Sequence, residues 1–322
     1  MFKQLTANAS FTGIKFRLLR SNAALSFKIL SKESSFILMR TIKKLHQAEY
    51  APIADLITYR VLPTRSIDYL NPFLFLNHHG LQVYPPFNQG LPFGPHPHRG
   101  METVTFILEG DIAHKDSGGH ESVMTEGGVQ WMTAGRGLIH AEVSSEVFKK
   151  SGGPLEILQL WINLPAKSKM TTPFYKGLQK DAIPSLTLDE GKVTVNLISG
   201  DWEGHKAAFE SGIGVQLNTI FFKPGGKLSI PVPPDHHIFF YVIRGKLTVN
   251  DTEVEQLYLA EFNNDGDQIN ISADEDSVLL FGQAKPLNEP MVAQGPFVMN
   301  TEKEIQEAYA DYRQGKFGAS NF

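Results

Sequence analysis

The sequence predicts an all-β protein with two barrels in tandem, and three observations support this expectation. The chain has 322 residues, which is long for a single hydrophobic core. Short runs rich in β-branched and aromatic residues alternate with turns that contain glycine, proline and asparagine. The second half repeats this spacing with different polar residues, so we expect two related barrels of different chemistry.

The composition is that of an ordinary globular protein, with 42% hydrophobic and 20% charged residues. A formal net charge of -4 argues against direct nucleic-acid binding, which needs a concentrated basic face. Cysteine is absent, which excludes disulfides and thiolate metal sites and fits a reducing compartment. We therefore expect a cytoplasmic monomer that contacts neither nucleic acid nor membrane.

Residues 1–38 differ in composition from the rest of the chain, because they are basic and carry no acidic residue before Glu33. One interpretation is a targeting presequence, although the apolar residues are too dispersed for a secretory signal or a membrane span. The other takes the second methionine, Met39, as a natural start, which would make residues 1–38 a disordered or loosely docked extension.

The first half contains two early candidate strands, at 56–62 and 73–76. His78 and His79 follow the second one, and adjacent strand residues face opposite ways, so at most one could point toward a pocket. We do not expect either to bind a metal. The segment 85–95 is rich in proline and glycine and predicts a rigid loop at the mouth of the barrel.

The chemistry concentrates between Gly94 and Glu142, in two pairs of metal-binding side chains. In a strand, residues i and i+2 share a face, so His96 and His98 project together, as do His140 and Glu142. Three imidazoles and one carboxylate suit a divalent transition metal, with iron(II) the first expectation, and leave coordination positions open for water, oxygen or substrate. The alternative is that these two pairs of side chains lie on loops by chance and bind no metal.

The intervening residues predict the rest of a barrel. Candidate strands cover 103–108, 130–132 and 155–164, glycines at 135–137 form the turn before His140, and 165–173 is a linker. His114 and His120 flank a polar turn, where we expect hydrogen-bonding imidazoles of a hairpin and no metal ligand.

These motifs resemble the pirin family of the cupin superfamily. The resemblance covers nearly everything after about residue 40 and rests on His96-Pro97-His98-Arg99-Gly100, Leu108-Glu109-Gly110, Ala113-His114-Lys115-Asp116, Gln130-Trp131-Met132-Thr133-Ala134-Gly135-Arg136-Gly137, His140-Ala141-Glu142 and Gly295-Pro296-Phe297-Val298-Met299-Asn300-Thr301. It implies two tandem cupin barrels, each a double-stranded β-helix or jelly roll, and a C-terminal helix. The implied domains are 39–165, which holds the metal, and 166–322, which does not.

Carried over by resemblance, the metal ligands are His96, His98, His140 and Glu142. The general cupin pattern would take Glu102 in place of Glu142, and strand parity alone leaves both open. We expect Glu142 to bind the metal and Glu102 to orient a histidine or Arg99.

The resemblance further implies an iron-dependent dioxygenase similar to quercetin 2,3-dioxygenases, acting on a flavonol-like aromatic substrate and O2. Glu142 or Glu102 would accept the substrate's proton, and candidates to cover a flat ring are Phe93, Phe106, Leu108, Trp131 and Met132. Two alternatives stay open: a redox-sensing protein that binds a protein partner as a transcriptional co-regulator, and other metal chemistry on the same scaffold.

In the second half, prolines stand where the first half has its paired histidines. Counting back from Arg244-Gly245 places Pro231 and Pro233 at the positions of His96 and His98. Proline has no coordinating side chain, so we expect no metal there, and we expect His236 and His237 to be structural. Apolar residues spaced by three and four over 302–312 predict a final helix capped by Thr301.

Overall fold

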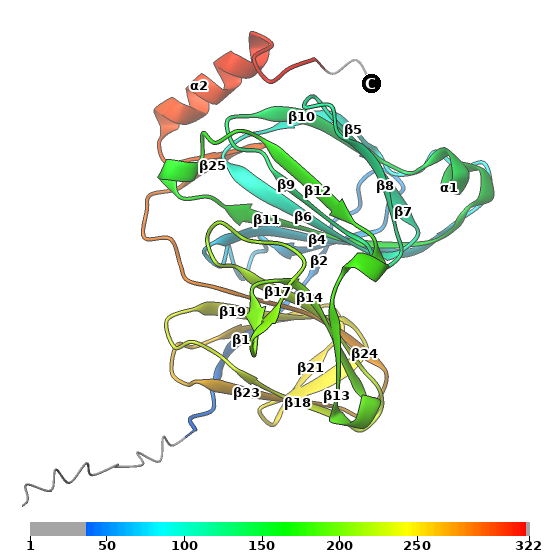
Figure 1. The fold of residues 1–322 in the computed structure, drawn as a ribbon, viewed down its shortest axis with the longest axis vertical. Helices are drawn as coiled ribbons and strands as arrows, with labels where there is room; N and C mark the ends of the chain where they lie inside the picture. The colour runs from blue at the N-terminus through cyan, green and yellow to red at the C-terminus, as the bar shows by residue number, and fades with distance from the viewer. Residues whose placement is uncertain (1–36, 320–322) are drawn as a thin grey trace, which may run out of the picture. The chain divides into compact units, whose positions relative to one another are not determined.

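In a computed structural model that describes residues 37–319, each half of the chain forms a barrel from one large and one small antiparallel sheet (Figure 1). Within this described part, no helix is both long and apolar enough to cross a membrane. The expectations for the basic leader concern residues 1–36, which lie outside the described residues.

The first barrel pairs a seven-stranded sheet with a four-stranded one. The large sheet has the order β12 (Phe174–Leu178), β9 (Val129–Thr133), β6 (Met101–Glu109), β11 (Gly153–Asn163), β4 (Phe73–Tyr84), β3 (Thr58–Leu62) and β2 (Glu49–Tyr50). The small sheet has the order β5 (Phe93–His98), β10 (Leu138–Val143), β7 (Asp111–Asp116) and β8 (Glu121–Thr125). A short helix, α1 (Glu146–Ser151), joins β10 to β11.

The second barrel repeats this plan. Its large sheet has the order β1 (Ile42–Gln47), β22 (Tyr258–Phe262), β19 (His237–Arg244), β24 (Ser277–Ala284), β17 (Gln216–Phe222), β14 (Val193–Ser199) and β13 (Ser185–Leu188). Its small sheet has the order β18 (Gly226–Pro231), β23 (Gln268–Ala273), β20 (Lys246–Val249) and β21 (Thr252–Glu255). The predicted two-barrel, all-β fold is confirmed.

The remaining elements are short, apart from the last helix. They are the hairpins β15 (Asp201–Trp202) with β16 (His205–Lys206) and β25 (Val292–Gln294) with β26 (Phe297–Met299), and the 3-10 turns η1 (Ala166–Ser168), η2 (Lys180–Ala182) and η3 (Asp189–Gly191). Helix α2 (Glu302–Arg313) begins at the predicted Thr301 cap, where Thr301 and Glu304 form a reciprocal capping box.

Strand pairing does not follow the predicted boundaries at 39 and 165. Strand β1 pairs with β22 of the second barrel, and β12 pairs with β9 of the first. The C-terminal hairpin and α2 return to the first barrel, where Phe297 and Ile305 pack with Ile139 (Figure 1). The sequence alone does not show which barrel these terminal and linking segments join, because the edge strand of either barrel can pair with a short strand.

The two barrels share one apolar core. Leu158 and Leu160 of β11 cluster there with Tyr241 and Leu280 of the second barrel. Phe106 and Trp131 belong to the same core, and Leu108 packs against it. Three of the five residues expected to cover an aromatic substrate therefore stabilise the contact between barrels, because they occupy the outward face of their strands.

Candidate metal centre

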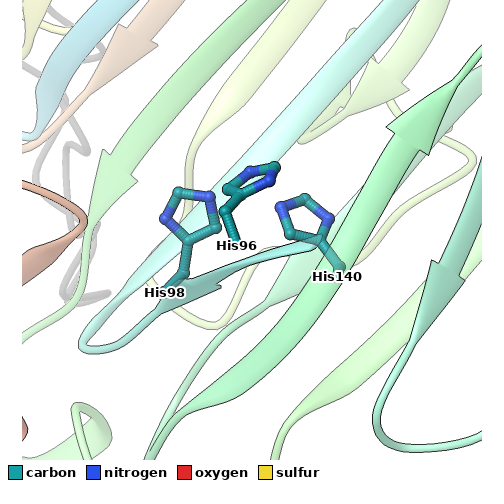
Figure 2. A group of neighbouring side chains, drawn as sticks. All are labelled: His96, His98 and His140. Atoms are coloured by element: carbon teal, nitrogen blue, oxygen red, sulfur yellow. The ribbon is translucent and has the colours of Figure 1, made fainter. Parts of the chain in front are cut away.

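Three histidine side chains converge inside the first barrel, from neighbouring strands of its small sheet (Figure 2). Strands β5 and β10 are antiparallel, with His140 opposite His96 and Leu138 opposite His98. The ring centroid of His140 lies 4.4 Å from that of His96 and 5.0 Å from that of His98. One ring nitrogen from each of the three lies within 4.8 Å of the others, which is a spacing that one metal ion can bridge.

A sharp turn after His98 takes the chain from the small sheet to the large one. Gly100 adopts φ +80°, and a Cβ there would lie 2.0 Å from the carbonyl oxygen of Val298. The fully buried Lys169 ammonium donates to the carbonyls of Gly100 and Val298, at 2.9 Å each, and to Asn163 Oδ1 at 2.6 Å. Burial lowers the pKa of Lys169 to about 8. The predicted linker thus contains the side chain that fixes the end of the ligand strand.

Burial favours the neutral forms of His98 and His140, which are the forms that bind a metal. Burial, with the nearby His96, lowers the pKa of His98 to about 3, and burial with His98 and His96 lowers the pKa of His140 well below its ordinary value. His96 Nδ1 donates to the carbonyl of Gly94 at 2.7 Å, which leaves Nε2 free for a metal. Within residues 37–319, neither ring nitrogen of the buried His140 has a hydrogen-bond partner. The donor set therefore fits a divalent transition metal.

Glu142 lies beside this group and belongs to a second, overlapping one. A carboxylate oxygen of Glu142 and ring nitrogens of His140 and His114 lie within 4.8 Å of one another. The carboxylate accepts hydrogen bonds from Thr105 Oγ1 at 3.1 Å, from Gln159 Nε2 at 2.5 Å and from Gln130 Nε2. These three donors come from the large sheet, so Glu142 connects the two sheets across the barrel interior.

The structure does not bring Glu102 to the histidines. Glu102 pairs in register with Thr133 and Ile162 and accepts a hydrogen bond from Thr133 Oγ1 at 2.7 Å. It shares its face of β6 with Val104, whose side chain lies in the core between the barrels, whereas Thr105 faces Glu142. The parity that relates His98 to Glu102 fails because the turn at Gly100 moves the chain to another sheet.

Glu102 does not orient Arg99 either, because other groups accept the hydrogen bonds of the Arg99 guanidinium. Its guanidinium donates to the carbonyl of Arg136 at 2.7 Å and to Asp311 Oδ2 of α2 at 3.0 Å. The C-terminal helix thereby contacts the residue next to His98.

Several residues of the site have no sequence signal of their own. His114 was predicted to lie in a polar hairpin, and no role in the site was predicted for four further residues: Gln130, Gln159, Trp161 and Tyr175. Strand alternation could have indicated them, because they occupy the same inward face as Thr105 and Met132. His120 fits the hairpin expectation, since it is half exposed and bonds to Asp116.

Both groups of metal-binding side chains among residues 37–319 lie in the first barrel. In the second barrel, Pro231 ends β18, and His237 Nδ1 donates to the carbonyl of Asn71 at 2.8 Å. That this barrel binds no metal stays a prediction.

Known proteins match this chain along most of its length. Family models match as Pirin over residues 55–162 and as Pirin C-terminal cupin domain over 218–318. Human pirin is 37% identical over 259 residues, which is 77% of this chain and 83% of that protein.

Solved structures agree with these matches. A structure described as quercetin 2,3-dioxygenase from Acinetobacter baumannii has a TM-score of 0.82 and 36% identity, and the match covers 88% of this chain and all of that one. A bacterial pirin from Escherichia coli, solved in complex with nickel(II), shares the fold with a TM-score of 0.60 at 22% identity, over 76% of this chain and 99% of that one.

The fold and the site together define a bicupin with a cluster of metal-binding side chains in its first barrel. The matches over both barrels make the assignment more specific: the chain belongs to the pirin family.

Proposed function

We propose that this protein is an iron(II)-dependent dioxygenase that cleaves a flavonol such as quercetin with O2. The proposed ligands are His96, His98, His140 and Glu142. The observation that carries the proposal is His140, which is fully buried beside two other imidazoles and has both ring nitrogens unpartnered among the described residues. A buried imidazole without a partner is costly unless something binds it. The similarity to the Acinetobacter structure supports the choice of reaction.

A bound iron(II) would polarise the substrate's hydroxyl and keto oxygens and bring O2 beside them. Residues of the chain would take up the substrate's proton and hold the reacting groups in place. Glu142 would take up the proton of the substrate's hydroxyl group, while Gln130, Gln159 and Thr105 hold its carboxylate in place. Glu102 has no part in this step, because it lies on the opposite face of β6.

An aromatic wall stands next to the histidines. Trp161 meets the His98 ring edge to face at 5.1 Å between centroids, and Phe75 stacks on Trp161 at 4.4 Å. Met132 lies on the inward face of β9, opposite Tyr175 of β12. We propose that Trp161 and Met132 cover the flat substrate, in place of Phe106, Leu108 and Trp131. Substrate and O2 are then the only partners needed.

Oxygen uptake tests the proposed reaction. Iron-loaded protein with quercetin under air should consume flavonol and oxygen together. His140→Ala should abolish both, whereas His205→Ala, on an exposed strand of the second barrel, should change neither. Weak flavonol binding without oxygen uptake above the metal-free control would contradict the dioxygenase. A difference in surface protection between ferrous and ferric protein, again without uptake, would favour the redox-sensing alternative.

A further inference from the structure

His114 and His140 each have a buried ring nitrogen without a hydrogen-bond partner among the described residues, as His98 has at Nδ1. The exposed fractions of the two residues are 1% and 0%. For His114 the unpartnered atom is Nδ1, and for His140 it is both nitrogens. A buried donor or acceptor left unsatisfied destabilises the folded protein, so such histidines lying side by side need an explanation.

The orientation of His114 is fixed from two sides. Its Nε2 faces Asp116 Oδ2 at 3.2 Å, and its ring stacks on Tyr175 at 3.9 Å between centroids with 12° between planes. Asp116 is itself held by the backbone N–H groups of Gly118 at 2.8 Å and His120 at 3.1 Å. If the Asp116 carboxylate accepts the hydrogen on Nε2, the matching tautomer of His114 presents a lone pair at Nδ1.

That lone pair is available to His140. On the paired strands β7 and β10, Asp116 is opposite His140 and His114 is opposite Glu142, so His114 lies diagonally across from His140. The two ring centroids are 5.4 Å apart, and ring nitrogens of the two residues lie within 4.8 Å of each other. A hydrogen bond from an N–H of His140 to His114 Nδ1 requires this separation to close to about 3 Å.

We propose that His114 is a positioning residue that accepts a hydrogen bond from the second ring nitrogen of His140, forming a His140, His114, Asp116 relay behind the metal. A metal-binding histidine almost always donates its other N–H to an acceptor, which fixes the ring and strengthens it as a ligand. One such bond satisfies His114 Nδ1 and one nitrogen of His140, and leaves the other nitrogen of His140 for the metal. His96 already has the equivalent partner in the carbonyl of Gly94.

A direct ligand role for His114 is the competing interpretation. His114 shares a group with His140 and Glu142, but its Nε2 already bonds to Asp116 and its ring stacks on Tyr175, which holds the ring beside His140. The arrangement fits an acceptor behind His140 better than a further ligand in the same shell.

The proposal rests on the metal site of the proposed function but not on flavonol cleavage, so it is tested without substrate. The variants are His114→Phe, which keeps the ring that stacks on Tyr175 but removes the acceptor, and His114→Gln, which restores an acceptor oxygen. His120→Phe is the matched control, because His120 contacts the same Asp116 carboxylate without belonging to either metal-binding group. The measurements are iron(II) affinity by chelator competition, the iron midpoint potential, and the number of nitrogen ligands by X-ray absorption.

We expect His114→Phe to lose about 10 to 100-fold in iron affinity with an unchanged number of nitrogen ligands. Its midpoint potential should become more positive, because a less electron-rich His140 stabilises the ferric ion less. His114→Gln should recover most of the affinity, and His120→Phe should resemble the wild type. Asp116→Ala, measured in parallel in case His114→Phe does not fold, should shift the potential in the same direction by less.

Two results would overturn the proposal. One is wild-type affinity and potential in His114→Phe, and the other is the loss of one nitrogen ligand in that variant, which would make His114 a direct ligand. Failure of the proposed function would be recognisable separately, as wild-type protein that binds iron with this relay intact yet consumes no quercetin.

Discussion

At the scale of single residues, two carboxylates in similar motifs have different surroundings. Glu142 faces the barrel interior and accepts three hydrogen bonds from the large sheet, whereas Glu102 faces the contact between barrels and accepts one from Thr133. Glu102 Oε2 is buried and unpartnered among the described residues, and burial raises the pKa of this carboxyl. The two carboxylates therefore have different surroundings, one beside the histidines and one on the face toward the other barrel.

Glutamine substitution should show this difference as metal affinity. We expect Glu142→Gln to lose most bound iron, because a neutral amide is a much weaker ligand than a carboxylate. Glu102→Gln should keep wild-type affinity, since its side chain lies on the opposite face of β6. Titration with a competing chelator checks both variants. Metal loss in Glu102→Gln with retention in Glu142→Gln would reverse the assignment.

The raised pKa of Glu102 also predicts a pH dependence of stability. The folded state favours the protonated form of the Glu102 carboxyl. The stabilisation of the folded protein by this form is complete below the ordinary pKa of 4.5, and it is lost as the pH rises through the higher folded-state pKa. Glu102→Gln cannot ionise and should escape that loss. Urea unfolding of metal-free protein should find the variant more stable than wild type at neutral pH, with the difference narrowing below 4.5. A difference that widens in acid would contradict this account.

At the scale of elements, alternation along β5 and β10 was sufficient to predict the convergence of three histidines. It could not show that the chain changes sheets at Gly100, and this is why strand alternation alone left Glu102 open as a ligand. Nor could it show that α2 contacts Arg99 through Asp311, because no local pattern relates residues so far apart in the sequence.

The contact between α2 and Arg99 should contribute measurably to stability. In Asp311→Ala the nearly buried Arg99 guanidinium would lose a charged acceptor, so we expect a loss of about 1–3 kcal/mol in unfolding free energy. Glu307→Ala is the matched control on the same helix. Its ion pair with Lys303 is exposed, and its loss should cost less than about 0.5 kcal/mol. Equal effects of the two changes in urea denaturation would argue against a role for this contact.

At the scale of the whole molecule, the two barrels are joined by an apolar core and a buried polar chain. Tyr241 of the second barrel contacts His78 Nδ1 at 2.8 Å, His78 Nε2 contacts Glu156 Oε1 at 2.9 Å, and Glu156 pairs with Arg244. Sequence analysis gave His78 no metal-binding role, which agrees with this position. It did not predict the chain, whose members come from both barrels.

Removing the Tyr241 hydroxyl tests this connection. Tyr241→Phe would leave His78 Nδ1 buried without its partner, and we expect it to cost about 1–3 kcal/mol of stability without changing iron affinity. Tyr309→Phe, which removes a solvent-exposed hydroxyl bonded at 3.3 Å to the carbonyl of Gln294, should cost almost nothing. Thermal unfolding monitored by calorimetry separates these outcomes, and an unchanged Tyr241→Phe would show that the polar chain adds no stability.

The metal content of purified protein tests the central claim most directly, because the account places one metal site in the first barrel and none in the second. Elemental analysis should find about one transition metal ion per chain in the wild type. The double variant His96→Ala/His98→Ala should contain almost none. Two ions per wild-type chain, or full occupancy in the double variant, would contradict the assignment of the site.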